Sequence, residues 1–172
     1  MKNLFFILLF LAEVSQAIAQ IPSCDGNRYK NYVFGSADSI INVQYGKNYT
    51  MNNVFQNLKM DIFLPKADTV IKRPLIIFIH GGGFISGDKK DMRSICILFA
   101  LKGFVTASIN YRLIDVPVVD STVVAEGMVR AMSDAKAALR FFVEDAATQN
   151  HYKTDSNYPD QFIKGITFLS NA

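Results

Sequence analysis

The sequence contains few of the residues that bind metals or nucleic acids. Among its 172 residues there are two cysteines and two histidines, His80 and His151, and the cysteines lack a CxxC spacing. We therefore expect no metal site and no cofactor. Lys and Arg number 18 against 15 Asp and Glu, and the densest basic point is the pair at 89–90. Because nucleic-acid binding requires a clustered basic stripe, no nucleic-acid partner is predicted.

Apolar runs long enough to span a bilayer are absent as well, and the longest run lies at the N-terminus. Lys2 precedes a nine-residue apolar stretch at 4–12, and an A-x-A pattern follows at 17–19. A membrane-spanning helix needs about 20 apolar residues, so this run is too short. The pattern predicts that residues 1–19 are a signal peptide cleaved before Gln20. The mature chain is then expected to be secreted or periplasmic, with no membrane contact after cleavage.

The first cysteine leaves several alternatives open. A lipobox at 21–24 would make Cys24 an acylation site, but Pro22 is awkward in that motif. In an oxidising compartment Cys24 and Cys96 are candidates for a disulfide. The alternative is a buried free Cys96 with an exposed Cys24, because the sequence does not fix the separation of the two residues.

Half of the residues are hydrophobic, and their periodicity predicts one packed α/β domain. Alternation places Ile41, Val43 and Tyr45 on one face of a short strand that ends at 46–48, and a second alternating strand covers 58–65. Both are expected to be half-buried, antiparallel and near a sheet edge. The elements expected afterwards are a buried strand at 74–80, a helix at 89–102, a buried strand at 104–112, a helix at 123–147 and a strand at 162–169. This order predicts a mainly parallel sheet with antiparallel N-terminal strands and flanking helices.

Three consecutive glycines follow the strand at 74–80, in the segment His80-Gly81-Gly82-Gly83-Phe84. Glycine costs backbone entropy, so the run requires either a tight packing turn or a loop whose N–H groups approach a ligand. The segment does not match a phosphate-binding loop, because Asp88 occupies the position at which that motif requires lysine. An oxyanion hole, which stabilises the negative oxygen of an attacked ester carbonyl, fits the segment.

The three segments HGGGF (80–84), ASINYRL (107–113) and SDAKAALRFF (133–142), in this order, resemble the N-terminal half of secreted carboxylesterases of the α/β-hydrolase superfamily. The similarity covers about residues 40–160 and is closest to the hormone-sensitive-lipase-like and feruloyl-esterase-like branches. It implies that residues 20–172 are the N-terminal part of one α/β-hydrolase domain, an incomplete one. It also implies ester hydrolysis by serine acyl transfer, with a small-molecule or carbohydrate-linked ester as substrate.

The resemblance assigns roles to a few residues. Gly82 and Gly83 match the glycines whose N–H groups form the oxyanion hole. His80 matches the histidine that positions this loop and is not the catalytic base. Asp134 and Arg140 match helix positions that are structural.

The sequence departs from the family where the nucleophile is due. It contains no G-x-S-x-G, and the segment 164–172 reads KGITFLSNA. Thr167 and Ser170 are the two candidate nucleophiles there. Gly165 matches the first glycine of the strained turn for Thr167, but Leu169 stands at the second glycine position, and for Ser170 it is Phe168 that stands at the first. His151 precedes this segment, whereas the catalytic base should follow it, so His151 is interpreted as a surface residue. The chain by itself is therefore expected to be inactive.

Three hypotheses remain at this stage. The first is a truncated esterase whose nucleophile, acid and histidine lie outside the chain. The second is a non-catalytic secreted binding module with a partial α/β-hydrolase fold. The third is a serine peptidase, because peptidases share this fold and fold alone does not define the reaction. The oligomeric state is left open by all three.

Overall fold

The computed structural model describes residues 26–117 and 119–155. The signal-peptide prediction, Cys24, the strand expected at 162–169 and both candidate nucleophiles, Thr167 and Ser170, lie outside these residues. The elements are β1 (Ala37–Tyr49), β2 (Phe55–Pro65), β3 (Leu75–Ile79), the 3-10 helix η2 (Lys89–Met92), α2 (Arg93–Ala100), β4 (Val105–Ile109) and α3 (Ser121–Thr148).

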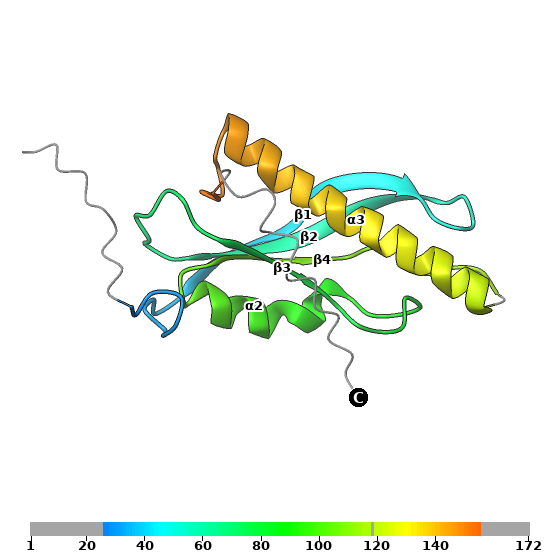
Figure 1. The fold of residues 1–172 in the computed structure, drawn as a ribbon, viewed down its shortest axis with the longest axis horizontal. Coiled ribbons are helices and arrows are strands. Elements are labelled where there is room, and N and C mark those ends of the chain that lie inside the picture. Colours follow the sequence, from blue (N-terminus) through cyan, green and yellow to red (C-terminus); the bar gives the residue numbers. More distant parts are fainter. Residues whose placement is uncertain (1–25, 118, 156–172) are drawn as a thin grey trace, which may run out of the picture.

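The described strands form one mixed sheet in the order β1-β2-β4-β3. β1 pairs antiparallel with β2, and β2 pairs antiparallel with β4, which confirms the antiparallel N-terminal strands. β3 and β4 are parallel and are joined through η2 and α2, as a β-α-β unit requires. The two helices cover opposite faces of the sheet (Figure 1). The structure is an incomplete α/β fold in which antiparallel pairings outnumber parallel ones within the described part of the chain.

Strand β2 is buried on both faces over residues 60–63, so its prediction as a half-buried strand was wrong there. Met60 and Ile62 join the core between the sheet and α3. Phe63 joins a second core with Met92 and Cys96 on the α2 side. Alternation in the sequence does not reveal this burial, because the second face is covered by a helix that lies 30 residues further along the chain.

A β-bulge in β1 overturns the predicted face of Ile41. The pairing register shifts between Ile40 and Val43, and Asn42 adopts a left-handed φ of 61°. The extra residue directs Ile40 and Val43 toward the core, whereas the side chain of Ile41 is 41% exposed. The N–H of Asn42 donates to the Asp61 carboxylate at 2.9 Å, which holds the bulge in place.

β1 also continues through the predicted stop at 46–48 and ends at Tyr49. Gly46 lies under α3, where an added Cβ would be 3.5 Å from Leu58 Cδ1 and 4.0 Å from the Cβ of Ala137. This glycine therefore faces α3 at ordinary contact distance and does not end the strand.

Both predicted helices are present with small shifts of their bounds. The helix expected at 89–102 is divided into η2 and α2, and the Asp88 side chain caps it by accepting from the N–H of Lys90 at 2.9 Å. α3 begins two residues earlier than expected, because Asp120 caps it by accepting from the N–H of Val123 at 2.9 Å.

Cys96 lies on the buried side of α2 with no exposed surface, and its thiol is free. Burial raises the pKa of this thiol to about 12. This position agrees with the alternative in which Cys96 is a core residue, although Cys24 lies outside the described residues.

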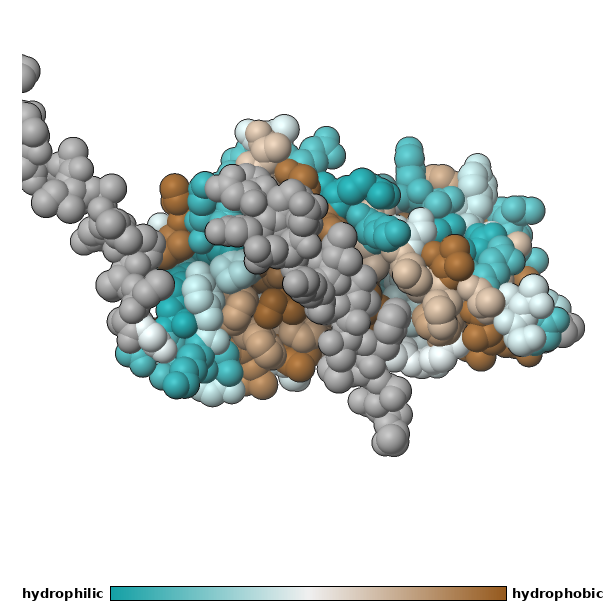
Figure 2. All heavy atoms as spheres, in the orientation of Figure 1, coloured by the Kyte–Doolittle hydropathy of each residue, from teal (hydrophilic) through white to brown (hydrophobic). Residues whose placement is uncertain are grey.

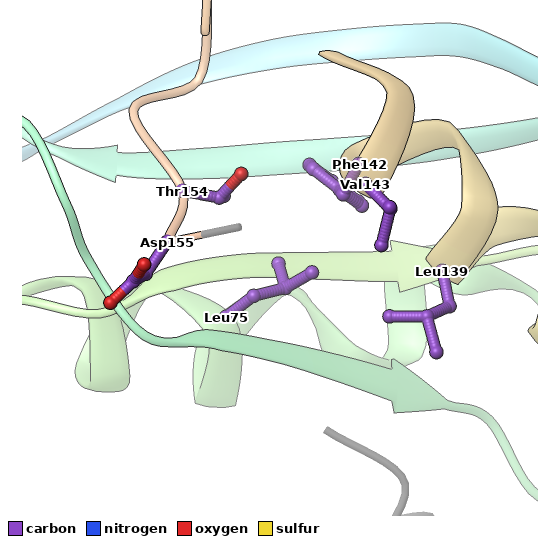
Figure 3. A pocket seen from close by; sticks show the side chains of 6 residues that line it. All are labelled: Leu75, Leu139, Phe142, Val143, Thr154 and Asp155. Atoms are coloured by element: carbon purple, nitrogen blue, oxygen red, sulfur yellow. The ribbon is translucent and has the colours of Figure 1, made fainter. Parts of the chain in front are cut away.

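The free edge of β3 meets the segment that follows α3. Arg73, before β3, and Thr154 form a parallel bridge, with Arg73 N–H donating to Lys153 O at 3.0 Å. A small, mostly apolar hollow lies at this end of β3 (Figure 3), and its lining residues are Leu75, Leu139, Phe142, Val143, Thr154 and Asp155. Within the described residues β3 pairs with β4 alone.

Candidate active site

The glycine run is placed at the carboxyl end of the parallel strand pair. His80 directly follows β3, and Asn110 directly follows β4, which is parallel to it. In α/β sheets, ligands bind at the carboxyl ends of the strands. The apolar hollow lies at the opposite end of β3, about 16 Å away at 3.3 Å per residue, and is not part of this site.

Gly82 forms a tight turn that no other residue type fits. Its φ is +110°, and an added Cβ would lie 2.1 Å from the carbonyl oxygen of Ser86. The N–H groups of Ile85 and Ser86 both donate to Gly82 O at 3.1 Å. The packing explanation of the glycine run therefore holds at Gly82.

Gly83 is different, because the space around it is open. Its φ is +60°, and an added Cβ would meet no atom within 4 Å. Gly82 and Gly83 are both exposed, and neither N–H donates a hydrogen bond within the described part of the chain. The loop thus contains two adjacent exposed glycines whose N–H groups have no acceptor among the described residues.

His80 is buried at the base of this loop, with 1% of its surface exposed. Its ring stacks on Tyr111 at a centroid distance of 4.5 Å and an interplanar angle of 17°. The Tyr111 hydroxyl donates to the His80 carbonyl oxygen at 3.1 Å. His80 Nδ1 lies 2.8 Å from Gly81 O, and Nε2 has no partner among the described residues. The side chain therefore faces the core and not the solvent.

The far end of the loop returns to His80. Gly87 has a φ of +111°, and an added Cβ would lie 2.3 Å from His80 Nδ1. Asp88 accepts a hydrogen bond from Asn110 Nδ2 at 2.9 Å. Both ends of the loop are thus attached to the segment that follows β4. Sequence reasoning missed Gly87, Asn110 and Tyr111, although the last two lie inside the ASINYRL segment.

The middle of the loop is attached to α3. Ile114 N–H donates to Phe84 O at 2.7 Å. A Cβ added to Gly127, on α3, would lie 2.8 Å from Ile114 Cδ1 and 3.6 Å from the Phe84 Cβ. Gly127 therefore allows the helix to pack tightly behind the loop.

Apolar residues border this region. Exposed hydrophobic side chains include Ile85 on the loop, and Met128, Val129 and Met132 on α3. Figure 2 shows apolar surface at the end of the molecule where the first turns of α3 and the glycine loop lie in Figure 1. The exposed glycines of the loop thus lie near an apolar surface.

The remaining residues singled out from the sequence lie elsewhere. Asp134 is buried, and its carboxylate pairs with Arg112 at 2.7 Å, whereas Arg140 is exposed on α3. His151 is exposed beyond the C-terminus of α3. At 1.5 Å per residue it lies roughly 30 Å along the helix from Gly127, which packs behind the loop. The structure thus brings His80, Gly82 and Gly83 together and leaves His151 apart.

Two carboxylates near this region, the buried Asp61 and the half-buried Asp88, predict a specific pH dependence of stability. Burial raises the pKa of Asp61, but hydrogen bonds from Lys89 Nζ and the Asn42 N–H outweigh it, so the pKa is lowered overall. The pKa of Asp88 is also lowered, since burial is outweighed chiefly by the hydrogen bond from Asn110. A pKa lowered by folding stabilises the protein above the unfolded value of about 4, and this stability is lost as pH falls through the folded value.

We therefore expect the free energy of unfolding to be nearly constant between about pH 7 and pH 5 and to fall steeply below about pH 4. Urea unfolding followed by circular dichroism at a series of pH values measures this quantity. Stability that is maintained or increased at pH 3 would contradict the stabilising contacts assigned to Asp61 and Asp88.

No group of three or more potential metal ligands occurs in the described ranges. Likewise, none of the helices in the described part of the chain has the length and apolar character that crossing a bilayer requires.

The fold is that of solved esterases. It matches an inhibited esterase B from Lactobacillus rhamnosis with a TM-score of 0.52 and 24% identity, over 84% of this chain and 42% of that chain. A second similar structure is Thermogutta terrifontis esterase 2 phosphorylated by paraoxon, with a TM-score of 0.49 and 26% identity over 75% of this chain and 43% of that chain. The described part of the chain thus has the fold of a portion of esterase B.

The family model BD-FAE matches residues 60–158, and the chain belongs to this family of esterase-like α/β-hydrolases. The earlier prediction from the three sequence segments is confirmed at this level.

The relatives found by sequence are much larger proteins, and the match covers only a small part of each. A non-reducing polyketide synthase of Emericella nidulans is 39% identical over 82 residues, which are 46% of this chain and 3% of that protein. One of Aspergillus novofumigatus is 38% identical over 81 residues, 45% of this chain and 3% of that protein. The chain spans about two fifths of the solved esterases and a small fraction of these synthases.

Proposed function

We propose that the loop of Gly82 and Gly83 is the oxyanion hole of a serine-dependent carboxylic ester hydrolase. The observation that carries this proposal is the pair of exposed glycines at the carboxyl end of β3, neither of whose N–H groups donates a hydrogen bond within the described residues. During acyl transfer these groups would donate to the carbonyl oxygen as it becomes negative. Loss of one such donor typically costs about 3–4 kcal/mol of transition-state stabilisation. The apolar surface beside the loop suits the acyl part of an ester.

In this proposal His80 positions the loop and takes no part in proton transfer. Its ring is buried against Tyr111, and its backbone carbonyl is held by the Tyr111 hydroxyl. A general base must instead reach the nucleophile within hydrogen-bond distance. We assign His80 to the support of the two N–H donors.

The substrate proposed is a small-molecule or carbohydrate-linked ester, met outside the cell. Residues 1–19 support export, because they combine a basic start, a short apolar run and an A-x-A pattern. No described feature favours a peptide substrate or a purely binding role over ester hydrolysis.

We further propose that the 172-residue chain alone does not turn over esters. Its sequence contains no G-x-S-x-G, and His151 lies roughly 30 Å from the helix turn behind the loop by helix length. Acyl transfer requires a nucleophile, a base and an orienting carboxylate together.

The purified chain is expected to hydrolyse p-nitrophenyl acetate no faster than buffer containing an equal concentration of an inert protein. The absorbance of the released p-nitrophenol at 400 nm, followed over minutes to hours, measures this rate. Turnover above the control that disappears in Ser170→Ala would contradict the proposal and identify Ser170 as the nucleophile. Turnover that persists in that variant and disappears in Thr167→Ala would point to Thr167.

A further inference from the structure

We propose that the buried ion pair of Asp61 and Lys89 is a positioning device for the glycine loop. Asp61 lies on β2 and Lys89 is the first residue of η2, directly after the loop. Neither residue reaches the surface on which a substrate would bind. The inference rests on the proposed oxyanion role of Gly82 and Gly83, and it names the residues that fix their position.

The pair is buried and well coordinated. Asp61 has no exposed surface, and Lys89 is 3% exposed. Lys89 Nζ lies 2.8 Å from one Asp61 oxygen, and Arg93 approaches the other at 3.3 Å. The Asn42 N–H donates to the same carboxylate at 2.9 Å. Asp61 thus receives three donors, one from β1 and two from the continuous segment of η2 and α2, which fixes the orientation of its carboxylate.

A buried ion pair of this kind contributes little to the free energy of unfolding compared with an apolar pair. Taking both charges out of water is expensive, and a well-packed apolar pair of similar volume is often as stable or more stable. An apolar pair would not, however, fix the position of one backbone segment, because hydrophobic contacts are non-directional. The directional contact between Lys89 and Asp61 does fix it.

The position of Lys89 is transmitted to the loop through the backbone on its N-terminal side. The Lys89 N–H donates to the side-chain oxygen of Asn110, and the Asn110 amide donates to Asp88. One residue earlier, Gly87 touches the His80 ring so closely that no Cβ fits between them. His80 is itself fixed by Tyr111. The loop is therefore closed on itself, and a shift of Lys89 must displace Gly87 and change the path of the residues between.

The ten glycines of the chain provide a direct readout. In the full chain labelled with ¹⁵N-glycine, each glycine gives one amide signal, and the loop contributes Gly81, Gly82, Gly83 and Gly87. We expect Asp61→Asn to move these four signals while the signals of Gly35 and Gly103 keep their positions. The spectrum also reports folding, since an unfolded chain loses its signal dispersion.

A double variant separates positioning from charge balance. Asp61→Asn leaves the Lys89 charge buried without a full partner, which could act on stability alone. Asp61→Asn combined with Lys89→Met removes both charges and hence this penalty. If the pair positions the loop, the loop signals remain displaced in the folded double variant. If they return to their wild-type positions, the pair only balances charge and the proposal is overturned. Should the single variant unfold, the double variant alone decides between these outcomes.

Asp68→Asn is the matched control. Asp68 is a second buried carboxylate, and it pairs with Arg28 and Arg73. Arg28 also donates to Gly103 O at 3.3 Å. This variant is expected to move the Gly103 signal and to leave the four loop signals in place. Loop signals that move equally in Asp68→Asn and Asp61→Asn would also overturn the proposal, because the effect would then be general.

This experiment is independent of the proposed function. It measures the position of the loop in the absence of any ligand. If the loop moves in the Asp61 variants but the wild-type loop binds no oxyanion, the positioning stands and the proposed function fails. If the wild-type loop binds an oxyanion but the loop does not move in the Asp61 variants, the proposed function stands and the positioning role of the ion pair is rejected.

Discussion

Replacement of Gly87 by alanine is expected to lower the free energy of unfolding by about 3 kcal/mol. An L-residue at a positive φ costs roughly 1–2 kcal/mol, and overpacking a filled site costs roughly 1–3 kcal/mol. Both apply, because φ is +111° and the new Cβ would lie 2.3 Å from His80 Nδ1 and 2.5 Å from Gly81 O. The clash would separate the two ends of the loop. Urea unfolding of the full chain measures the change.

Substitutions of two other glycines separate the cost of the positive φ from the cost of the steric clash. Gly83 has a positive φ but open space, so Gly83→Ala should cost about 1 kcal/mol from backbone conformation alone. Gly35 has neither constraint, so Gly35→Ala should change stability by less than about 0.5 kcal/mol. If Gly87→Ala is as mild as Gly35→Ala, the loop is not closed against His80.

Replacement of Asp134 by alanine is expected to cost about 3–5 kcal/mol of stability, the range for breaking a buried ion pair. The side chains of Asp134 and Arg112 are 2% and 5% exposed. The carboxylate accepts from Arg112 Nε at 2.9 Å, from an Arg112 terminal nitrogen at 2.7 Å and from the Arg112 backbone N–H at 2.9 Å. Without the carboxylate, a buried guanidinium loses its charged partner. The shift in the urea unfolding midpoint reports the loss.

The exposed pair on the same helix is the matched control. Glu126 and Arg130 are one turn apart on α3 and lie 2.7 Å from each other, with side chains 53% and 27% exposed. Glu126→Ala should cost less than about 0.5 kcal/mol, because exposed pairs of this kind contribute little. Equal losses in Asp134→Ala and Glu126→Ala would show that burial does not determine the strength of the Arg112–Asp134 pair.

Periodicity predicted the elements well where burial follows local hydrophobicity. The strand at 74–80 and the helix at 123–147 are present with nearly the expected bounds. It failed around Asp61, because a charged residue in an alternating pattern indicates a solvent-facing position. Its burial depends on Lys89, which lies 28 positions along the chain. The same carboxylate holds the bulge at Asn42, so the wrong face of Ile41 has the same long-range cause.

The site shows a similar division. Gly82 and Gly83 were predicted because three consecutive glycines after a buried strand are a local and unusual signal. Gly87 and Tyr111 were not, since their roles arise only when the loop folds back on His80, and the bond from Tyr111 to His80 spans 31 positions. A single glycine immediately before the capping residue Asp88 was the available signal for Gly87.

Titration of the full ¹⁵N-glycine chain with sodium acetate tests the central claim most directly. Acetate is the acid product of acetyl-ester hydrolysis and carries an oxyanion. The account predicts saturable downfield shifts of the Gly82 and Gly83 amide protons, absent with sodium chloride at equal ionic strength. No shift at these two glycines, or equal shifts at all ten, would contradict the assignment of the loop as an oxyanion hole.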